Sequence, residues 1–553
     1  MPGTRVARNP ATALRAIFLV KPAEASPDSA SMRTSKRFPV IFTCIVLACI
    51  TLPQIAQAVA PPPDGGYPGG NTAEGYLALG SLTTGAYNTA VGIYSILSLT
   101  DGNFCTGVGA GTLLANTADE NTATGAGALF SNTTGDLNTA NGAFALFSNT
   151  TGTENVAVAT DALVFNESGN FNNAVGAFAL FNNVDGSGNN AFGNAALRES
   201  IHAGGNTAIG DRALMNNDIT GAGLGMDNTA VGRSALTSNT DGDSNTAVGF
   251  EALFSNTTGV SNTAIGAGTL PFNTGNGNTA VGKSALEGNT TGLENTAIGG
   301  GALSANTAGL DNAATGFVSL SHNTTGGANT ADGSGALFNN TTGGFNTAVG
   351  QGALQANTTG SANVALGVSA GGNVTTADNV ICIGATVAGA NVSNRCYIGN
   401  IRGVTTGNNN AIPVLIDTAG QLGTVSSSRR YKKEIKPMDN ASEVILALNP
   451  VTFHYKTDKT NRPEFGLIAE EVAEVNPDLV VRDENGGIYT VRYDAVNAML
   501  LNEFLKEHRT VEDQQEEIEA LKAELREQRD LIQKVSAKIE MGKTARRVAG
   551  IDQ

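Results

Sequence analysis

Residues 245–261 read NTAVGFEALFSNTTGVS, and this stretch decides the fold because it is one copy of a repeat. The unit of about 17 residues recurs eighteen times, beginning at Asn71, Asn88, Cys105, Asn121, Asn138, Asn155, Asn172, Asn189, Asn206, Asn228, Asn245, Asn262, Asn278, Asn295, Asn312, Asn329, Asn346 and Asn363. The step changes only by single deletions and by one insertion around residues 219–226. A register this strict predicts a solenoid in which each unit stacks on the next.

Each unit has the parts of a strand-based coil. Residues 246–249 (TAVG) alternate as a short strand does, so Thr246 and Val248 share one face. A second apolar segment follows at residues 252–254 (ALF), and residues 256–259 (NTTG) have the Asn and Gly that let a chain turn. Helical solenoids need longer units with fewer Gly, so the repeat predicts a mainly β fold, a β-solenoid or β-roll.

Stacking places equivalent residues of successive units above one another. We expect Val248, Ile265 and Val281 to form an apolar ladder inside the coil, and the repeated Asn residues to form a hydrogen-bonded one. The Thr column shares the Val face, so we expect it to face inward too. A core of Ala, Val, Ile and Leu is thin, which favours a homotrimer whose shared axis also buries the second apolar segment. A monomeric solenoid is the alternative.

The repeats, from about Asn71 to Asn400, resemble the β-roll heads of trimeric autotransporter adhesins, whose coils carry related N-x-A-I/V-G units. The resemblance implies a trimeric β-roll. The unit here is longer than the usual adhesin unit, and the C-terminal membrane anchor of that family is missing from the sequence.

Composition argues against several other classes of protein. Gly supplies 69 of 553 residues, Trp is absent, and only 15% of residues are charged, while the hydrophobic share of 41% exceeds that of disordered chains. The net charge of −16 argues against a nucleic-acid partner. We interpret the acidic residues of the rod as a solvated face. Bound calcium and a flat array of Thr hydroxyls are the alternatives, and no cofactor is expected.

The N-terminal region indicates export. Residues 1–31 are an extension of uncertain status, and Met32 is an alternative start. Residues 32–58 have basic residues, an apolar run at 40–52 and a small-x-small site at Ala56-Gln57-Ala58, which is typical of a secretory signal peptide. The run is shorter than the roughly 20 residues that span a bilayer, so we expect cleavage and no stable membrane span in the mature chain. An uncleaved anchor, and more weakly a lipoprotein signal at Cys49, are alternatives.

A Pro/Gly-rich linker at 59–70 leads into the rod, which we assign to residues 71–400. Three cysteines follow the signal, an odd number without CxxC spacing: Cys105, Cys382 and Cys396. We interpret them as buried small side chains, with a Cys382–Cys396 disulfide as the alternative. The histidines are scattered, so we predict no His-based metal site; they are His202, His322, His454 and His508.

Charged residues become frequent after Asn400, and the repeat disappears. We interpret residues 401–422 as a connector and 423–507 as a small α+β domain. Helices are expected at 440–448 and 464–475, a strand at 451–455, and a hairpin of 479–482 with 488–493. A last helix is expected to begin near Asp494.

Residues 508–541 have the heptad pattern of a coiled coil, and residues 542–553 are interpreted as a flexible tail. The a positions are Val511, Ile518, Leu525, Ile532 and Ile539, and the d positions are Gln514, Leu521, Gln528 and Val535. This pattern suits a specified oligomer, and a trimer would match the rod. A single surface helix is the alternative.

Four segments occur in order in the C-terminal domain: 427–435 (SSRRYKKEI), 450–453 (PVTF), 465–472 (FGLIAEEV) and 491–494 (VRYD). They resemble the successive motifs of the endosialidase-type intramolecular chaperone, found at the ends of phage tail fibres and of some bacterial surface proteins. The resemblance covers about residues 423–507. It implies a domain that promotes trimerisation of the β-rich stalk before it and then removes itself by autoproteolysis with a Ser–Lys dyad.

Carried onto this chain, the resemblance makes Ser427 the catalytic nucleophile and Lys432 the base. Many members of the family have Asp where this chain has Ser428, so Ser426 and Ser428 stay open as alternatives. A Ser hydroxyl needs a base, and an amine accepts its proton only when neutral, a form favoured by burial and by the neighbouring cations Arg429, Arg430 and Lys433. A basic linker without chemistry is the alternative.

Residues five apart meet neither on a straight strand nor on one helix face. The chain therefore has to bend between Ser427 and Lys432, or the lysine has to come from a neighbouring protomer.

The sequence thus predicts an exported, trimeric surface fibre or adhesin-like protein whose C-terminal chaperone drives trimerisation and is released by single-turnover self-cleavage. A phage-derived tail fibre or tailspike with the same chaperone, and a purely structural envelope scaffold, are the alternatives. The expected partner is the chain itself.

Overall fold

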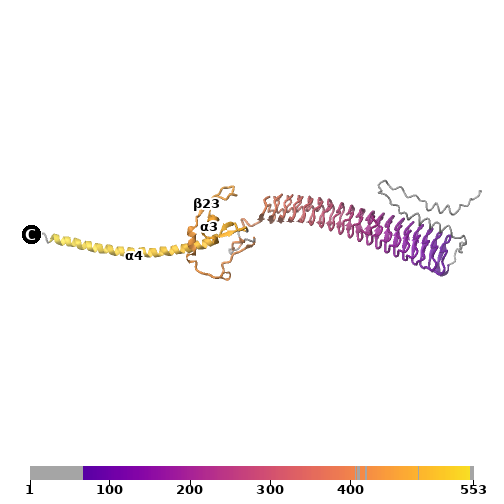
Figure 1. Cartoon of the computed structure of the whole chain (residues 1–553), viewed down its shortest axis with the longest axis horizontal. Coiled ribbons are helices and arrows are strands. Elements are labelled where there is room, and N and C mark those ends of the chain that lie inside the picture. Colours follow the sequence, from indigo (N-terminus) through magenta and orange to yellow (C-terminus); the bar gives the residue numbers. More distant parts are fainter. Residues whose placement is uncertain (1–66, 405, 408–410, 418–419, 484, 549–553) are drawn as a thin grey trace, which may run out of the picture. The chain divides into compact units, whose positions relative to one another are not determined.

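The computed structural model describes residues 67–404, 406–407, 411–417, 420–483 and 485–548. The expected N-terminal extension and signal peptide lie outside the described residues. Two compact units divide at Gly403 and Val404. The N-terminal unit is a solenoid of stacked coils, and the C-terminal unit contains short strands and helices (Figure 1).

The solenoid is one parallel sheet of 20 strands, which confirms the predicted mainly β fold. A short 3₁₀ helix, η1 (Pro68–Gly70), precedes it. The strands are β1 (Thr72–Glu74), β2 (Thr89–Val91), β3 (Thr106–Val108), β4 (Thr122–Thr124), β5 (Thr139–Asn141), β6 (Val156–Val158), β7 (Asn173–Val175), β8 (Asn190–Phe192), β9 (Thr207–Ile209), β10 (Thr229–Val231), β11 (Thr246–Val248), β12 (Thr263–Ile265), β13 (Thr279–Val281), β14 (Thr296–Ile298), β15 (Ala313–Thr315), β16 (Thr330–Asp332), β17 (Thr347–Val349), β18 (Val364–Leu366), β19 (Val380–Ile383) and β20 (Arg395–Ile398).

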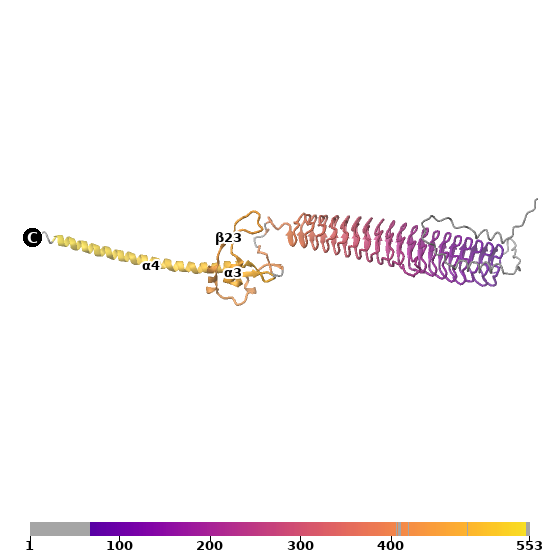
Figure 2. The same cartoon turned by 45° about the horizontal axis from the view of Figure 1, so that its top comes forward.

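Successive strands stack in register, so equivalent residues form columns along the solenoid (Figure 2). Thr246 pairs with Thr263, and Val248 pairs with Ile265. The ladder of Val248, Ile265 and Val281 therefore exists, as predicted.

That ladder lies on the outside of the coil, and the expectation that it forms the core was wrong. The middle residue of each strand points inward: Ala247 is fully buried, as are Ala252 and Leu253 of the second apolar segment. Thr246 and Val248 are only half-buried. The Thr column consequently faces outward as well. The second segment is already buried within one chain, so it is not free to line a trimer axis.

The interior beside the strand is tightly filled, and where Ser95 and Thr112 replace the Ala of most other coils not even a methyl group fits opposite them. At Gly107, which occupies the usual Ala position, an added Cβ would lie 2.6 Å from Ser95 Oγ and 2.8 Å from Thr112 Oγ1. Val or Ile at the middle position would overpack this space. Ala therefore lies inside and the larger β-branched residues lie outside.

Most strands are followed by a glycine that the stacking favours. Gly249 has φ of +137°, and a Cβ there would lie 2.5 Å from the carbonyl oxygen of Gly266 in the next coil. Glycine meets both conditions without strain, although Ala159 takes this place after β6 with φ of +119°. The second segment turns at Leu253, which adopts φ of +51° and places its side chain in the core.

Buried asparagines form two hydrogen-bonded ladders, as predicted. In the first, the Asn245 Oδ1 accepts from the backbone N–H of Asn262 at 3.0 Å, and its Nδ2 donates to the carbonyl of Gly259 at 2.8 Å. In the second, the Nδ2 of Asn256 donates to Asn239 Oδ1 at 2.9 Å. These side chains satisfy turn backbone groups that no strand can reach.

Replacing Asn245 with Ala is expected to destabilise the solenoid by about 1–3 kcal/mol, since it leaves the buried Asn262 N–H without an acceptor and removes one of the two donors to the Gly259 carbonyl, the other being Asn256 Nδ2. The midpoint of denaturant unfolding should fall accordingly. Thr258→Ala, at an exposed turn position, is the matched control and should leave the midpoint nearly unchanged. Equal midpoints for the two variants would contradict a stabilising role for the ladder.

The sheet continues two strands beyond the eighteen predicted. In β19 and β20, Val380 and Arg395 stand where the other repeats have their first Asn. Because that Asn was used to recognise the repeat, these two coils were not counted among the eighteen copies. Cys382 is buried in β19, whereas Cys396 is exposed in β20 opposite Ile381. Both cysteines are free, so the alternative of a disulfide between them is wrong.

The C-terminal unit contains three antiparallel strand pairs, short helices and one long helix. Its elements are β21 (Leu415–Ile416), β22 (Leu422–Gly423), η2 (Arg429–Tyr431), η3 (Asp439–Ala447), β23 (Val451–Phe453), β24 (Glu464–Gly466), α3 (Ala469–Val475), η4 (Pro477–Leu479), β25 (Val480–Arg482), β26 (Ile488–Val491) and α4 (Tyr493–Val548). The predicted hairpin is confirmed as β25 paired with β26, and the last helix begins within one residue of its predicted start.

The expected helix over 464–475 was wrong in its first half. Residues Glu464–Gly466 form β24, which pairs with β23, and only α3 is helical. A small core holds the unit together, with Val472, Leu479, Val480 and Val491 buried. In the described part of the chain, no helix has the length and apolar character needed to cross a membrane.

Candidate functional site

The structure brings Ser427 and Lys432 together within one chain. Lys432 Nζ donates to Ser427 Oγ at 3.5 Å, a distance at the long end for a hydrogen bond. Both residues lie just beyond β22, on either side of η2. The same two atoms are the ones between which a proton would move if the amine were neutral and accepted the Ser427 hydroxyl proton.

The short helix η2 makes this contact geometrically feasible. Its single turn is closed by bonds from Tyr431 N–H to the Ser428 carbonyl at 3.0 Å and from Lys432 N–H to the Arg429 carbonyl at 3.2 Å. Lys432 then returns to extended backbone, with φ of −117° and ψ of 140°. The bend folds the chain back on itself, so five residues of separation become one side-chain contact. Of the two predicted geometries, a bend or a lysine from a neighbour, the single chain has the bend.

The neighbouring serines have different hydrogen-bond partners. Ser428 caps η2, since its Oγ accepts from the backbone N–H of Arg430 at 3.4 Å and from the Arg430 side chain at 3.3 Å. Ser426 Oγ accepts from the Ser428 N–H at 3.3 Å. Among the three serines, Ser427 is the one for which the structure gives a contact with the lysine amine.

The surroundings of the pair are open and cationic. Ser427 and Lys432 are exposed, as are Arg429, Arg430 and Lys433. The Arg430 guanidinium lies 5.4 Å from the centre of the Tyr431 ring. The cations that the sequence predicted beside Lys432 are therefore present. In a single chain Lys432 is not buried, so this second condition for a neutral amine is not met.

A polar cluster fastens η3 to the start of α4. The Ser442 hydroxyl donates to a Glu503 carboxylate oxygen and accepts from Asn502 Nδ2 at 2.6 Å. Lys506 Nζ donates to Glu503 at 2.8 Å. The Lys506 ammonium and the Ser442 hydroxyl together hold the pKa of Glu503 below its usual range. Sequence reasoning missed this cluster, because its members are some 60 residues apart in the chain.

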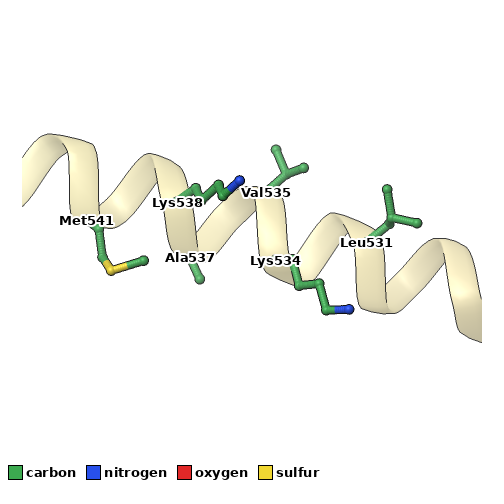
Figure 3. A pocket seen from close by; sticks show the side chains of 6 residues that line it. All are labelled: Leu531, Lys534, Val535, Ala537, Lys538 and Met541. Carbon is green, nitrogen blue, oxygen red and sulfur yellow. The ribbon is translucent and has the colours of Figure 1, made fainter.

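Two hollows of the described surface lie away from the Ser427–Lys432 pair. One is lined only by residues of α4: Leu531, Lys534, Val535, Ala537, Lys538 and Met541 (Figure 3). Another lies between η3 and α3 and is lined by residues such as Leu448 and Val472. Neither includes Ser427 or Lys432. Among the described residues, no group of three or more His, Cys, Asp or Glu side chains is placed to hold a metal ion.

Residues 427–481 match the model of a protein family described as the chaperone of endosialidase. The matched segment begins at Ser427 and runs through η3, β23, β24 and α3 into β25. No curated protein and no solved structure matches the chain. The family match confirms the resemblance drawn from the sequence motifs. Together with the solenoid before it, the match indicates a fibre-like protein with a C-terminal chaperone of this family.

Proposed function

We propose that this chain is an exported fibre protein that assembles as a homotrimer under the direction of its C-terminal chaperone and then releases that chaperone by cutting itself beside Ser427. The observation that carries the proposal is the family match beginning at Ser427, together with the contact of Lys432 Nζ with Ser427 Oγ.

Exposed apolar side chains in the C-terminal unit support self-association. Phe465 is 79% exposed and Tyr489 is 75% exposed, and α4 carries an exposed row of apolar residues along its length. The row consists of the predicted a and d residues Val511, Ile518, Leu521, Leu525, Ile532, Val535 and Ile539. A soluble monomer seldom leaves such a continuous stripe in water, and a coiled coil would bury it.

The near-identity of the coils explains why the solenoid would need a chaperone to align three chains. Neighbouring coils present nearly the same residues, as in the pairing of Thr246 with Thr263 and of Val248 with Ile265. Three such chains can align in wrong registers at little cost in free energy. A C-terminal trimer fixes the three chains at one end, so that the coils assemble from there. Removal of the clamp then leaves the assembled rod kinetically trapped.

The dyad supplies a single-turnover chemistry. Ser427 Oγ loses its proton to neutral Lys432 and attacks the carbonyl carbon of a peptide bond beside it. The C–N bond breaks as its nitrogen takes that proton, and water hydrolyses the resulting ester to leave an acid and a free hydroxyl. The pair is exposed in one chain, so neighbouring protomers are the source of the missing burial, and cleavage would then report on assembly.

Mass measurements on the exported protein test the proposal. Light scattering should give three times the 56.2 kDa chain mass before cleavage, less the removed signal. Intact-mass analysis should later show a C-terminal fragment of about 14 kDa, the size expected for a cut beside Ser427. A stable monomer of full length would contradict both assembly and self-cleavage.

A phage-derived tail fibre is the second candidate, because chaperones of this kind occur at the ends of phage fibres. Such a fibre needs no secretory signal. Residues 32–58 fused to a reporter enzyme distinguish the two: export of the reporter supports a cell-surface fibre, whereas retention in the cytoplasm supports a phage origin.

A further inference from the structure

The outer face of the solenoid sheet is a continuous surface of small and apolar side chains. The first and third residues of each three-residue strand point outward, as Thr246 and Val248 do in β11. They form two parallel columns over all 20 strands, since the strands stack in register. We call these two columns the strand face.

The apolar members of the strand face are exposed or half-buried. Many of the large exposed hydrophobic residues of the solenoid stand in its second column: Val91, Val108, Phe192, Ile209, Ile265, Ile298, Val349, Leu366, Ile383 and Ile398. Aromatic residues extend the surface at the corners beside the strands. Tyr87 stacks on Phe104 with 5.3 Å between ring centres, both exposed, and Phe317 and Phe345 are exposed farther along.

The strand face is almost free of charge, although the chain is strongly acidic. Within its two columns, Glu74 and Asp332 are the charged side chains of the described residues. Acidic residues lie instead in the turns, as Asp241 does, and at the corner before the strand, where Glu154 and Glu294 stand at the same repeat position as Tyr87 and Phe104. A face with so few charges along its length has the charge depletion of an interface core.

We propose that the strand face is the surface through which copies of this chain contact one another, with the columns of Thr246 and Val248 turned toward a common axis along the solenoid. This inference rests on the proposed homotrimer and names the face that forms it. It replaces the expectation that the second apolar segment lines the axis, because Ala252 and Leu253 are buried within one chain.

The strand face suits a contact that runs along the whole solenoid. Twenty strands spaced by about 4.8 Å, each about 10 Å long, present roughly 900 Å² per chain. A trimer divides this area between two partners, about 450 Å² to each, so the strand face reaches the area of a standard interface, about 800 Å² per partner, only together with other contacts such as those of α4.

A second copy of the chain has the same spacing between coils. Each coil of one chain can therefore face a coil of its partner. Acidic residues of the more distant turns, such as Asp241, would then point to solvent, and those at the corner, such as Glu154, would lie at the rim of the contact.

Engineered cysteines test the face directly in the full-length chain. The background carries Ser in place of Cys44, Cys49 and Cys396, while buried Cys105 and Cys382 are kept. Thr246→Cys and Val248→Cys place a thiol on the strand face, and Thr258→Cys places one on a turn as the matched control. These side chains point to solvent in one chain, so the coil itself should fold as before.

Mild oxidation, or a short bis-maleimide, should link chains through position 246 or 248 and not through position 258. Three thiols around one axis form one disulfide and leave one free thiol, so up to about two thirds of the chains should run as covalent dimers. Wild-type Cys396, which lies in the first column at β20, should behave in the same way.

The mass in solution separates the inference from the proposed function. A trimer that links through position 258, or through none of the three positions, would overturn the strand-face contact and leave the trimer intact. A monomer that links nowhere would overturn both the homotrimer and the strand-face contact. The strand face would then be a flat array of hydroxyl and methyl groups exposed to solvent.

Discussion

Ser427→Ala is expected to abolish release of the C-terminal fragment, so that the chain stays at full length indefinitely. The substitution removes the Oγ that Lys432 Nζ contacts and leaves the backbone of η2 unchanged. Intact-mass analysis over time measures the loss of the fragment of about 14 kDa. Loss of a covalent nucleophile typically lowers the rate by several orders of magnitude, about 10⁶-fold in serine peptidases.

Lys432→Arg should have nearly the same effect for a different reason. An arginine keeps the positive charge and much of the length of lysine, but its guanidinium stays protonated and cannot act as a base. Failure of cleavage in this variant would therefore show that proton transfer, rather than local charge, is required.

Two neighbouring serines provide matched controls. Ser426→Ala removes a hydroxyl one residue away, and Ser428→Ala removes the cap of η2 at a cost of about 1 kcal/mol in local stability. Cleavage should persist in both variants, more slowly in Ser428→Ala because the bend is less well held. If Ser428→Ala alone abolished cleavage, the nucleophile would be Ser428, and the Ser427–Lys432 contact would be incidental.

The repeat period was sufficient to predict a parallel solenoid, because a fixed step of about 17 residues leaves few ways to stack chemically similar units. The period could not decide which face of the strand lies inside. Both faces of a T-A-V strand are small or apolar, so alternation gives the same pattern for either choice. Packing decides it, because the middle residue of each strand lies in one buried cluster with the second segment, as Ala247 does with Leu253, and such contacts are between different segments of the coil.

The sequence predicted which two residues form the candidate pair. It did not predict how the backbone brings their side chains into contact. Motif resemblance selected Ser427 and Lys432, while their spacing alone left open a bend or a second protomer. The bend depends on Ser428 acting as a helix cap, a role that Ser shares with many turn positions and that no spacing rule isolates. The extra strand β24 was missed for a related reason, since its pairing with β23 is set by contact rather than by helical periodicity.

Ile518→Asp combined with Leu525→Asp is expected to prevent trimer formation. Both residues are a positions of α4, and both are exposed in the single chain. In a three-stranded coiled coil the variant would bury six carboxylates without partners, and an uncompensated buried charge costs about 3–5 kcal/mol. Light scattering should then give the mass of one chain.

The matched control is Ala523→Asp with Ala537→Asp, two f positions that point away from the seam in any coiled coil of this register. It adds the same charge to the same helix and should still form trimers. If assembly begins at this end, the Ile518/Leu525 variant should also yield a solenoid that proteases degrade, whereas the control should yield a resistant one. A monomeric chain with a protease-resistant solenoid would mean that the coils select their own alignment, and the chaperone would then have no part in building the rod.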